Sequence, residues 1–149
     1  MKLLQVCLTI DQRHGGAPCS TLGSFQELNK IGIDSTIVAF GESKLSISHP
    51  DFIPTIDSNL RKKICTVIRN KQNLHGHLLN FDELKKFYQK CHKADLIIIH
   101  QVYGLHSIYS FLFCKILKKP FVVMPHGSLT KYDQSKNRIK KMAANLLFY

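Results

Sequence analysis

The chain has 149 residues, of which 44% are hydrophobic, enough for one domain with a substantial core and too few for two full domains. This composition excludes wholesale disorder, and the formal net charge of +11 favours anionic partners such as phosphates, nucleic acid or acidic lipid head groups. Five scattered cysteines without a Cys-x-x-Cys pair indicate reduced, mostly buried thiols and a cytoplasmic protein.

Strands and helices are expected to alternate from the start of the chain. Residues 2–10 form an apolar run of strand length, which Asp11 closes without the cleavage site of a signal peptide. A helix is expected to begin at Pro18, whose missing N–H costs nothing at the first helical position. Residues 33–40 then predict a second strand, and residues 41–56 predict a loop.

The rest of the chain continues this alternation. The expected elements are a helix capped by Asp57 or Ser58 and carrying Leu60, Ile64, Val67 and Ile68, a loop over 70–80, a helix opened by Asp82, a strand over 94–100, a helix over 105–116, a strand over 121–123 and a helix over 139–147. The strands over 94–100 and 121–123 are apolar enough to be buried within a sheet. The pattern predicts an α/β, Rossmann-like domain, a parallel sheet with helices on both faces.

Three strand ends are expected to meet at one edge of this sheet. Residues 11–18 follow the first strand, residues 100–104 the third and residues 126–128 the fourth. Ligands of open parallel sheets bind just outside the carboxyl ends of the strands. Gly15 and Gly16 either leave the N–H groups of a helix start open to a phosphate or serve only a tight turn.

Four blocks of the sequence together carry a family resemblance. They are Gly15-Gly16, Gly32 to Val38, Ala94 to His100 and Lys119 to Leu129. In this order and spacing they resemble the amino-terminal half of family 4 glycosyltransferases of the GT-B fold, over nearly the whole chain. The resemblance implies transfer of a sugar from a nucleotide-diphosphate sugar to a glycan or lipid-linked acceptor, with retention, without an essential metal and without a cofactor. It also implies that Gly15 and Gly16 approach the donor diphosphate.

The resemblance implies roles for residues after the later strands. His126 would be the catalytic residue, bonded to the donor sugar near the reacting centre, with Gly127 beside it in the sugar site. His100 and Tyr103 would line the acceptor side. The residues alone leave alternatives open, since His126 could cap a backbone carbonyl in its loop and His100 could simply pack at a strand end.

The resemblance further implies a second domain, whose paired glutamates hold the nucleotide. The chain has three glutamates, Glu27, Glu42 and Glu83, all far apart. Residues 1–149 are therefore expected to form a single amino-terminal GT-B domain, incomplete at its C-terminal end and lacking the nucleotide-binding domain, with negligible transferase activity alone. Such a chain is a truncated product, one subunit of a split enzyme whose partner chain carries the second domain, or a domain kept for binding.

A different class of function also fits the charge, a non-catalytic basic module. Arg61 to Lys63 and residues 131–141 concentrate positive charge, and the second cluster leads into the apolar stripe over 139–147. Such a segment either packs in the core or lies on an anionic membrane, here the inner face, and the charge would also suit phosphorylated ligands. Neither a nucleic-acid-binding motif nor a four-ligand metal set accompanies the charge, so neither nucleic acid nor metal is expected.

Overall fold

The computed structural model describes residues 1–11, 14–41, 58–66, 79–130, 135 and 141–142. Within them, five parallel strands form one sheet in the order β3-β2-β1-β4-β5. The strands are β1 (Lys2–Cys7), β2 (Asp34–Ala39), β3 (Ile64–Thr66), β4 (Leu96–His100) and β5 (Phe121–Met124). The helices are α1 (Gly16–Lys30), α2 (Ser58–Arg61), α3 (Phe81–Lys93) and α4 (Leu105–Leu117).

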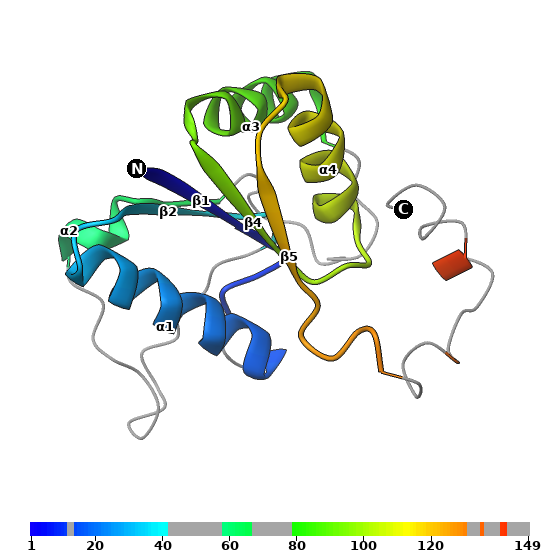
Figure 1. The fold of residues 1–149 in the computed structure, drawn as a ribbon, viewed down its shortest axis with the longest axis horizontal. Helices are drawn as coiled ribbons and strands as arrows, with labels where there is room; N and C mark the ends of the chain where they lie inside the picture. Colours follow the sequence, from blue (N-terminus) through cyan, green and yellow to red (C-terminus); the bar gives the residue numbers. More distant parts are fainter. Residues whose placement is uncertain (12–13, 42–57, 67–78, 131–134, 136–140, 143–149) are drawn as a thin grey trace.

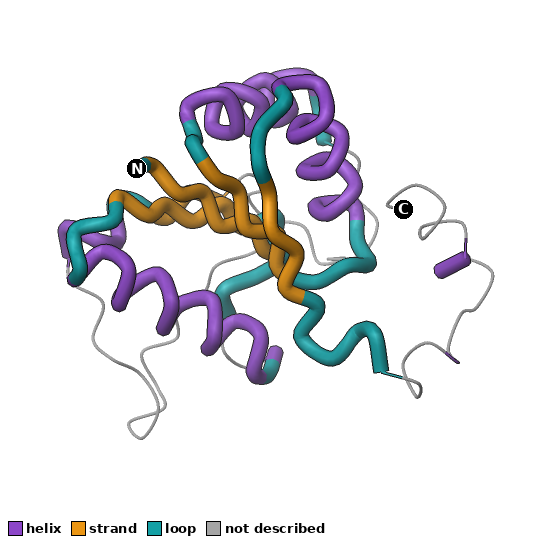
Figure 2. Tube along the Cα trace, viewed as in Figure 1, coloured by secondary structure: helices purple, strands orange, loops and turns teal. Residues whose placement is uncertain are grey.

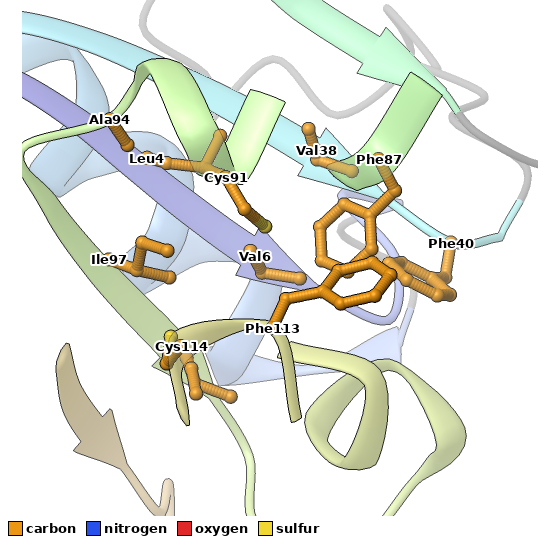
Figure 3. Packing of buried hydrophobic residues seen from close by; sticks show 11 residues of the cluster. Leu4, Val6, Val38, Phe40, Phe87, Cys91, Ala94, Ile97, Phe113 and Cys114 are labelled. Atoms are coloured by element: carbon orange, nitrogen blue, oxygen red, sulfur yellow. The ribbon is translucent and has the colours of Figure 1, made fainter. Parts of the chain in front are cut away.

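Helices cover both faces of the sheet, as predicted. α1 lies against one face, and α3 and α4 lie side by side on the other (Figures 1 and 2). The larger core forms under α3 and α4, where the ring of Phe87 lies 5.0 Å from that of Phe40. The ring of Phe113 completes this aromatic group at 5.5 Å from Phe87 (Figure 3). The predicted α/β, Rossmann-like fold is thus confirmed.

The order of the strands reverses at β1. The chain builds β1, β2 and β3 outward to one edge and then crosses back to place β4 on the other side of β1. Connections on the two sides of such a reversal leave in opposite directions, which opens a crevice at the carboxyl ends of the two central strands. The fold therefore points to the ends of β1 and β4 as the place where a ligand would bind.

The helix predicted to be capped by Asp57 or Ser58 forms only at its start and is wrong at Ile64, whereas Val67 and Ile68 lie outside the described residues. α2 has only four residues, and Ile64–Thr66 forms strand β3 at the edge of the sheet, paired with β2. The Lys63 ammonium binds Asp34 Oδ1 at 2.7 Å, which ties the start of β3 to the start of β2. Pairing with the open edge of β2 outweighs the helical spacing of the apolar residues, because β-branched side chains suit a pleated sheet.

Several predicted boundaries also shift. β1 ends at Cys7, although Ile10 beyond it stays buried. α1 begins at Gly16, two residues before Pro18. Proline is tolerated there because N–H groups of the first turn have no intrahelical acceptor. β4 begins at Leu96. The loop predicted over 41–56, the loop over 70–80 and the helix over 139–147 lie almost wholly outside the described residues.

The two later strands are less buried than predicted. In β4, Ile97 and Ile99 are fully buried beneath α3 and α4, but Ile98 on the opposite face is only partly buried. β5 is an edge strand, and Val122 is 50% exposed. Among the described helices only α1 makes extensive contact with that face, and it packs over β1 and β2. The apolar run over 121–123 therefore does not form the interior strand that its composition suggests.

The prediction of buried thiols is confirmed for three cysteines. Cys7, Cys91 and Cys114 are buried and form no disulfide. Burial raises the pKa of Cys7 to about 12 and that of Cys114 to about 11. Such thiols stay protonated at neutral pH and pack as small apolar side chains rather than as nucleophiles.

Candidate functional site

The predicted loops lie at one edge of the sheet. β1 pairs in parallel with β4, and β4 pairs in parallel with β5, so the segments that follow these three strands leave the sheet at the same edge. The candidate site residues named from the sequence lie at the ends of these strands, in the segments that follow them or at the start of the next helix. Two of them, His100 and His126, are in direct contact.

The two imidazoles are joined by a hydrogen bond. His100 Nδ1 and His126 Nε2 lie 2.8 Å apart, and the two rings are inclined by only 17°. His100 ends β4 and is 1% exposed, whereas His126 follows β5 and is partly exposed. The sequence predicted separate roles for these two residues on the acceptor and donor sides. The structure joins the two residues by a hydrogen bond, with a buried member and an accessible one, and does not test those roles.

Gln5 extends this hydrogen-bonded pair into the interior of the protein. Its contact with His100 was not predicted from the sequence. Its Oε1 lies 2.8 Å from His100 Nε2 and also accepts a hydrogen bond from Ser24 Oγ at 3.0 Å. Its Nε2 donates to Ser35 Oγ at 3.1 Å. Gln5, His100 and Ser35 are all fully buried, so the hydrogen bonds compensate the loss of water around these polar groups.

Burial keeps both imidazoles uncharged at neutral pH. The pKa of His100 is lowered to about 4, first by burial and then by the neighbouring imidazoles of His126 and His106. The pKa of His126 is also lowered, again by burial. A neutral imidazole has one N–H donor and one bare acceptor nitrogen, so the pair can bind a hydroxyl group or exchange a proton with it.

The backbone around the pair is held in unusual conformations. Gln101 and His126 have φ of 72° and 46°, in the left-handed region that L side chains rarely adopt. The turn that carries His126 is closed by Ser128, whose backbone N–H and hydroxyl both bond the carbonyl of Pro125. Strained positions of this kind cluster at functional sites.

His106 secures the segment after β4. Its Nε2 donates to the carbonyl of His100 at 2.9 Å, and Ser107 Oγ donates to the carbonyl of Gln101 at 3.0 Å. Both residues lie in the first turn of α4 and are buried. The start of α4 thereby fixes the chain just where it leaves β4, which fixes the position of the His100 ring.

Replacing Gly104 by alanine should disturb this support. An added Cβ would lie 2.7 Å from Cε1 and Nδ1 of the buried His106 ring, closer than real contacts allow. We expect the free energy of unfolding, measured by urea denaturation, to fall by about 1–3 kcal/mol. Gly23→Ala in α1 is the matched control. No atom lies within 4 Å of its Cβ, and it should stabilise by about 0.5–1 kcal/mol. Unchanged stability of Gly104→Ala would contradict the close packing.

The glycine pair lies at the open start of α1. Gly15 is the N-cap, with φ 97° and ψ −160°, a conformation suited to glycine, and no side chain caps the helix. A Cβ at Gly15 or Gly16 would meet no atom within 4 Å, so this helix start is unobstructed. The exposed N–H groups and the positive end of the helix dipole favour an anion here.

Tyr103 and Gly127 complete the predicted set. Tyr103 is partly buried in the segment between β4 and α4, and the Lys141 ammonium lies 5.0 Å from its ring centroid. This contact brings a positive charge to the segment that follows β4. Gly127 is exposed next to His126. The roles of all these residues stay predictions.

The fold and this edge place the protein in the class of open, Rossmann-like α/β proteins. Comparison with known proteins finds no matching protein family, no matching curated protein and no matching solved structure. The resemblance to glycosyltransferases therefore stays a prediction, to be argued from the site.

The described residues also bear on two other kinds of site. No three His, Cys, Asp or Glu side chains in this part of the chain lie close enough together to hold a metal ion. None of the helices described is both long and apolar enough to cross a membrane.

Proposed function

We propose that this chain is the acceptor-side half of a retaining glycosyltransferase that uses a nucleotide-diphosphate sugar. The His126 turn is the observation that supports the proposal best. The backbone of His126 is left-handed in this turn, just after a parallel strand, and its neutral imidazole is hydrogen-bonded to a second, buried imidazole. A fixed, uncharged hydrogen-bonding group suits a sugar hydroxyl, whereas the open start of α1 suits a diphosphate.

His126 would act mainly by orientation. A hydrogen bond from a rigid turn holds the donor sugar in one position while the bond to the diphosphate breaks. The N–H groups at Gly15 and Gly16 would stabilise the negative charge that develops on the leaving diphosphate. Tyr103 and His100 would shape the acceptor side, and for His100 this role is secondary to its contact with His126.

Transfer would also require a second Rossmann-like domain to hold the nucleotide, in a longer form of the chain or on a partner chain. Glycosyl transfer needs donor and acceptor enclosed together, away from water. We therefore expect the 149-residue chain to bind nucleotide-sugars weakly and to transfer sugar at negligible rates.

Substitution of Gly16 tests the proposal directly. We expect Gly16→Glu to weaken binding of UDP-glucose or GDP-mannose about tenfold, because a carboxylate at the start of α1 repels the diphosphate. The same carboxylate favours the helix dipole, so the fold should be kept. Affinity is measured by NMR titration of the backbone amide signals at position 16 and at His126. Gln89→Glu is the control, since it makes the same charge change at an exposed position of α3.

The outcomes separate the alternatives. Loss of binding in Gly16→Glu alone supports the proposal. Equal affinity of both variants, or no binding of any nucleotide-sugar, contradicts it. If inorganic pyrophosphate binds as tightly as the nucleotide-sugars without shifting the His126 signal, the chain is instead a module for phosphorylated ligands.

A further inference from the structure

The apolar strand β1 contains one buried amide, Gln5. Its neighbours Leu4 and Val6 belong to the core beneath α3 and α4, and Gln5 points to the opposite face, toward His100. An apolar side chain would fill this position without any need for a hydrogen bond. The amide must therefore be explained by what it contacts, and it contacts the imidazole that holds His126.

We infer that Gln5 and His100 are positioning residues which set the tautomer of His126, so that Nε2 of His126 carries the proton and Nδ1 is left as a hydrogen-bond acceptor for a ligand hydroxyl. The structure itself supports this assignment of protons. That the hydroxyl belongs to a sugar rests on the proposed function.

The positions of the protons are set from the interior outward, starting at Gln5. Gln5 Oε1 is a carbonyl oxygen and can only accept, while the amide Nε2 points elsewhere and donates to Ser35 Oγ. His100 Nε2, at 2.8 Å from this oxygen, must then carry a proton and donate it. A neutral His100 has no second proton, so its Nδ1 is a bare acceptor.

The direction of the hydrogen bond between His100 and His126 follows from that between His100 and Gln5. With His100 Nδ1 as acceptor, the proton in the 2.8 Å contact must belong to His126 Nε2. His126 is also neutral, so its Nδ1 has no proton and carries a lone pair. Among the described residues, the only hydrogen bond of His126 is the one to His100.

This arrangement has a chemical consequence for the ligand. A lone pair on His126 Nδ1 accepts a hydrogen bond from a hydroxyl group and repels the oxygens of a phosphate. The diphosphate is thereby directed away from His126, and the hydroxylated part of the ligand toward it. In the opposite tautomer, His126 Nδ1 would carry the proton. It would then be a hydrogen-bond donor and would bind a phosphate.

The direct test is to locate the proton between the two imidazoles. In the wild-type chain labelled with ¹⁵N-histidine, near pH 7.5, we expect the bridging proton to show its one-bond coupling to His126 Nε2, with His126 Nδ1 unprotonated. His126→Gln, which removes one imidazole, assigns the signals. A bridging proton bound to His100 Nδ1 would overturn the inference without any need for a further variant.

Gln5→Glu provides a second, stronger test, because it should reverse the arrangement. A buried carboxylate beside His100 Nε2 favours the charged imidazolium, which must then donate from Nδ1 as well. His126 Nε2 becomes the acceptor, and its proton moves to Nδ1. We expect the His126 signals to change to the Nδ1–H tautomer. A well-folded Gln5→Glu chain whose His126 tautomer is unchanged would contradict the role of Gln5.

Ligand binding separates this inference from the proposed function. Gln5→Glu should weaken UDP-glucose about tenfold without weakening UDP, because only UDP-glucose presents glucose hydroxyls to His126 and an N–H at Nδ1 does not repel a phosphate. Equal loss for both ligands, or for neither, counts against the tautomer role. If the wild-type chain binds neither ligand, the proposed function fails, and the position of the bridging proton alone decides the inference.

Discussion

Truncation of Phe87 should destabilise the protein more than truncation of any other α3 side chain to alanine. We expect the free energy of unfolding, measured by urea denaturation, to fall by about 3–5 kcal/mol. Phe87 is fully buried, and its ring meets Phe40 edge-on at 5.0 Å and Phe113 at 5.5 Å. The cavity would open where α3, α4 and β2 meet, and surrounding helices and strands cannot close it without losing their own contacts.

The same helix offers a control with the same chemistry. Phe81 begins α3 and is 79% exposed, so Phe81→Ala removes an identical side chain without opening a cavity. We expect its effect to stay within about 0.5 kcal/mol. If both variants lost equal stability, the aromatic group would not be the centre of the core.

Mild acid should destabilise the fold through His100. An unfolded histidine has a pKa near 6.5, whereas burial and the neighbouring imidazoles lower the pKa of His100 to about 4 in the folded chain. At a pH between these two pKa values, His100 is protonated in the unfolded chain and neutral in the folded chain. The free energy of unfolding therefore falls as the pH is lowered. At roughly 1.4 kcal/mol per pKa unit, the loss between pH 7 and pH 4.5 should be about 2–3 kcal/mol. The lowered pKa of His126 adds in the same direction.

The measurement is urea unfolding in steps between pH 7 and pH 4.5, a range that stays above most carboxylate pKa values. His100→Gln, which has no titrating group at this position, should flatten the pH dependence even if its stability is lower throughout. A wild-type chain that is equally stable at pH 7 and pH 4.5 would show that His100 does not stay neutral in the fold.

Most of the fold follows from the order of its apolar runs. Short runs at 2–10, 33–40 and 94–100 alternate with helical stripes, and such alternation favours a parallel sheet with helices on its faces. The prediction failed at Ile64–Thr66. A three-residue strand is too short to show its own period, and it forms because the edge of β2 is available to it. Whether the edge of β2 is open to a further strand depends on the tertiary structure and cannot be read from the local sequence.

The site could be predicted only in part. His100 and His126 each follow a strand, and parallel pairing places such ends on one edge, so their nearness was within reach of the sequence. Gln5 was harder to predict because it lies 95 residues from its partner. The available signal was one amide within an apolar strand, since a buried amide requires a partner. Identifying that partner required the register of β1 against β4.

The left-handed backbone at His126 also bears on what selection has kept in this chain. At a φ of 46° a glycine, like the one that follows at Gly127, would cost the folded state less than an imidazole. Selection for stability alone should therefore remove His126. A costly side chain at the accessible end of a buried hydrogen-bonded pair is the pattern expected where activity, rather than folding, determines the residue.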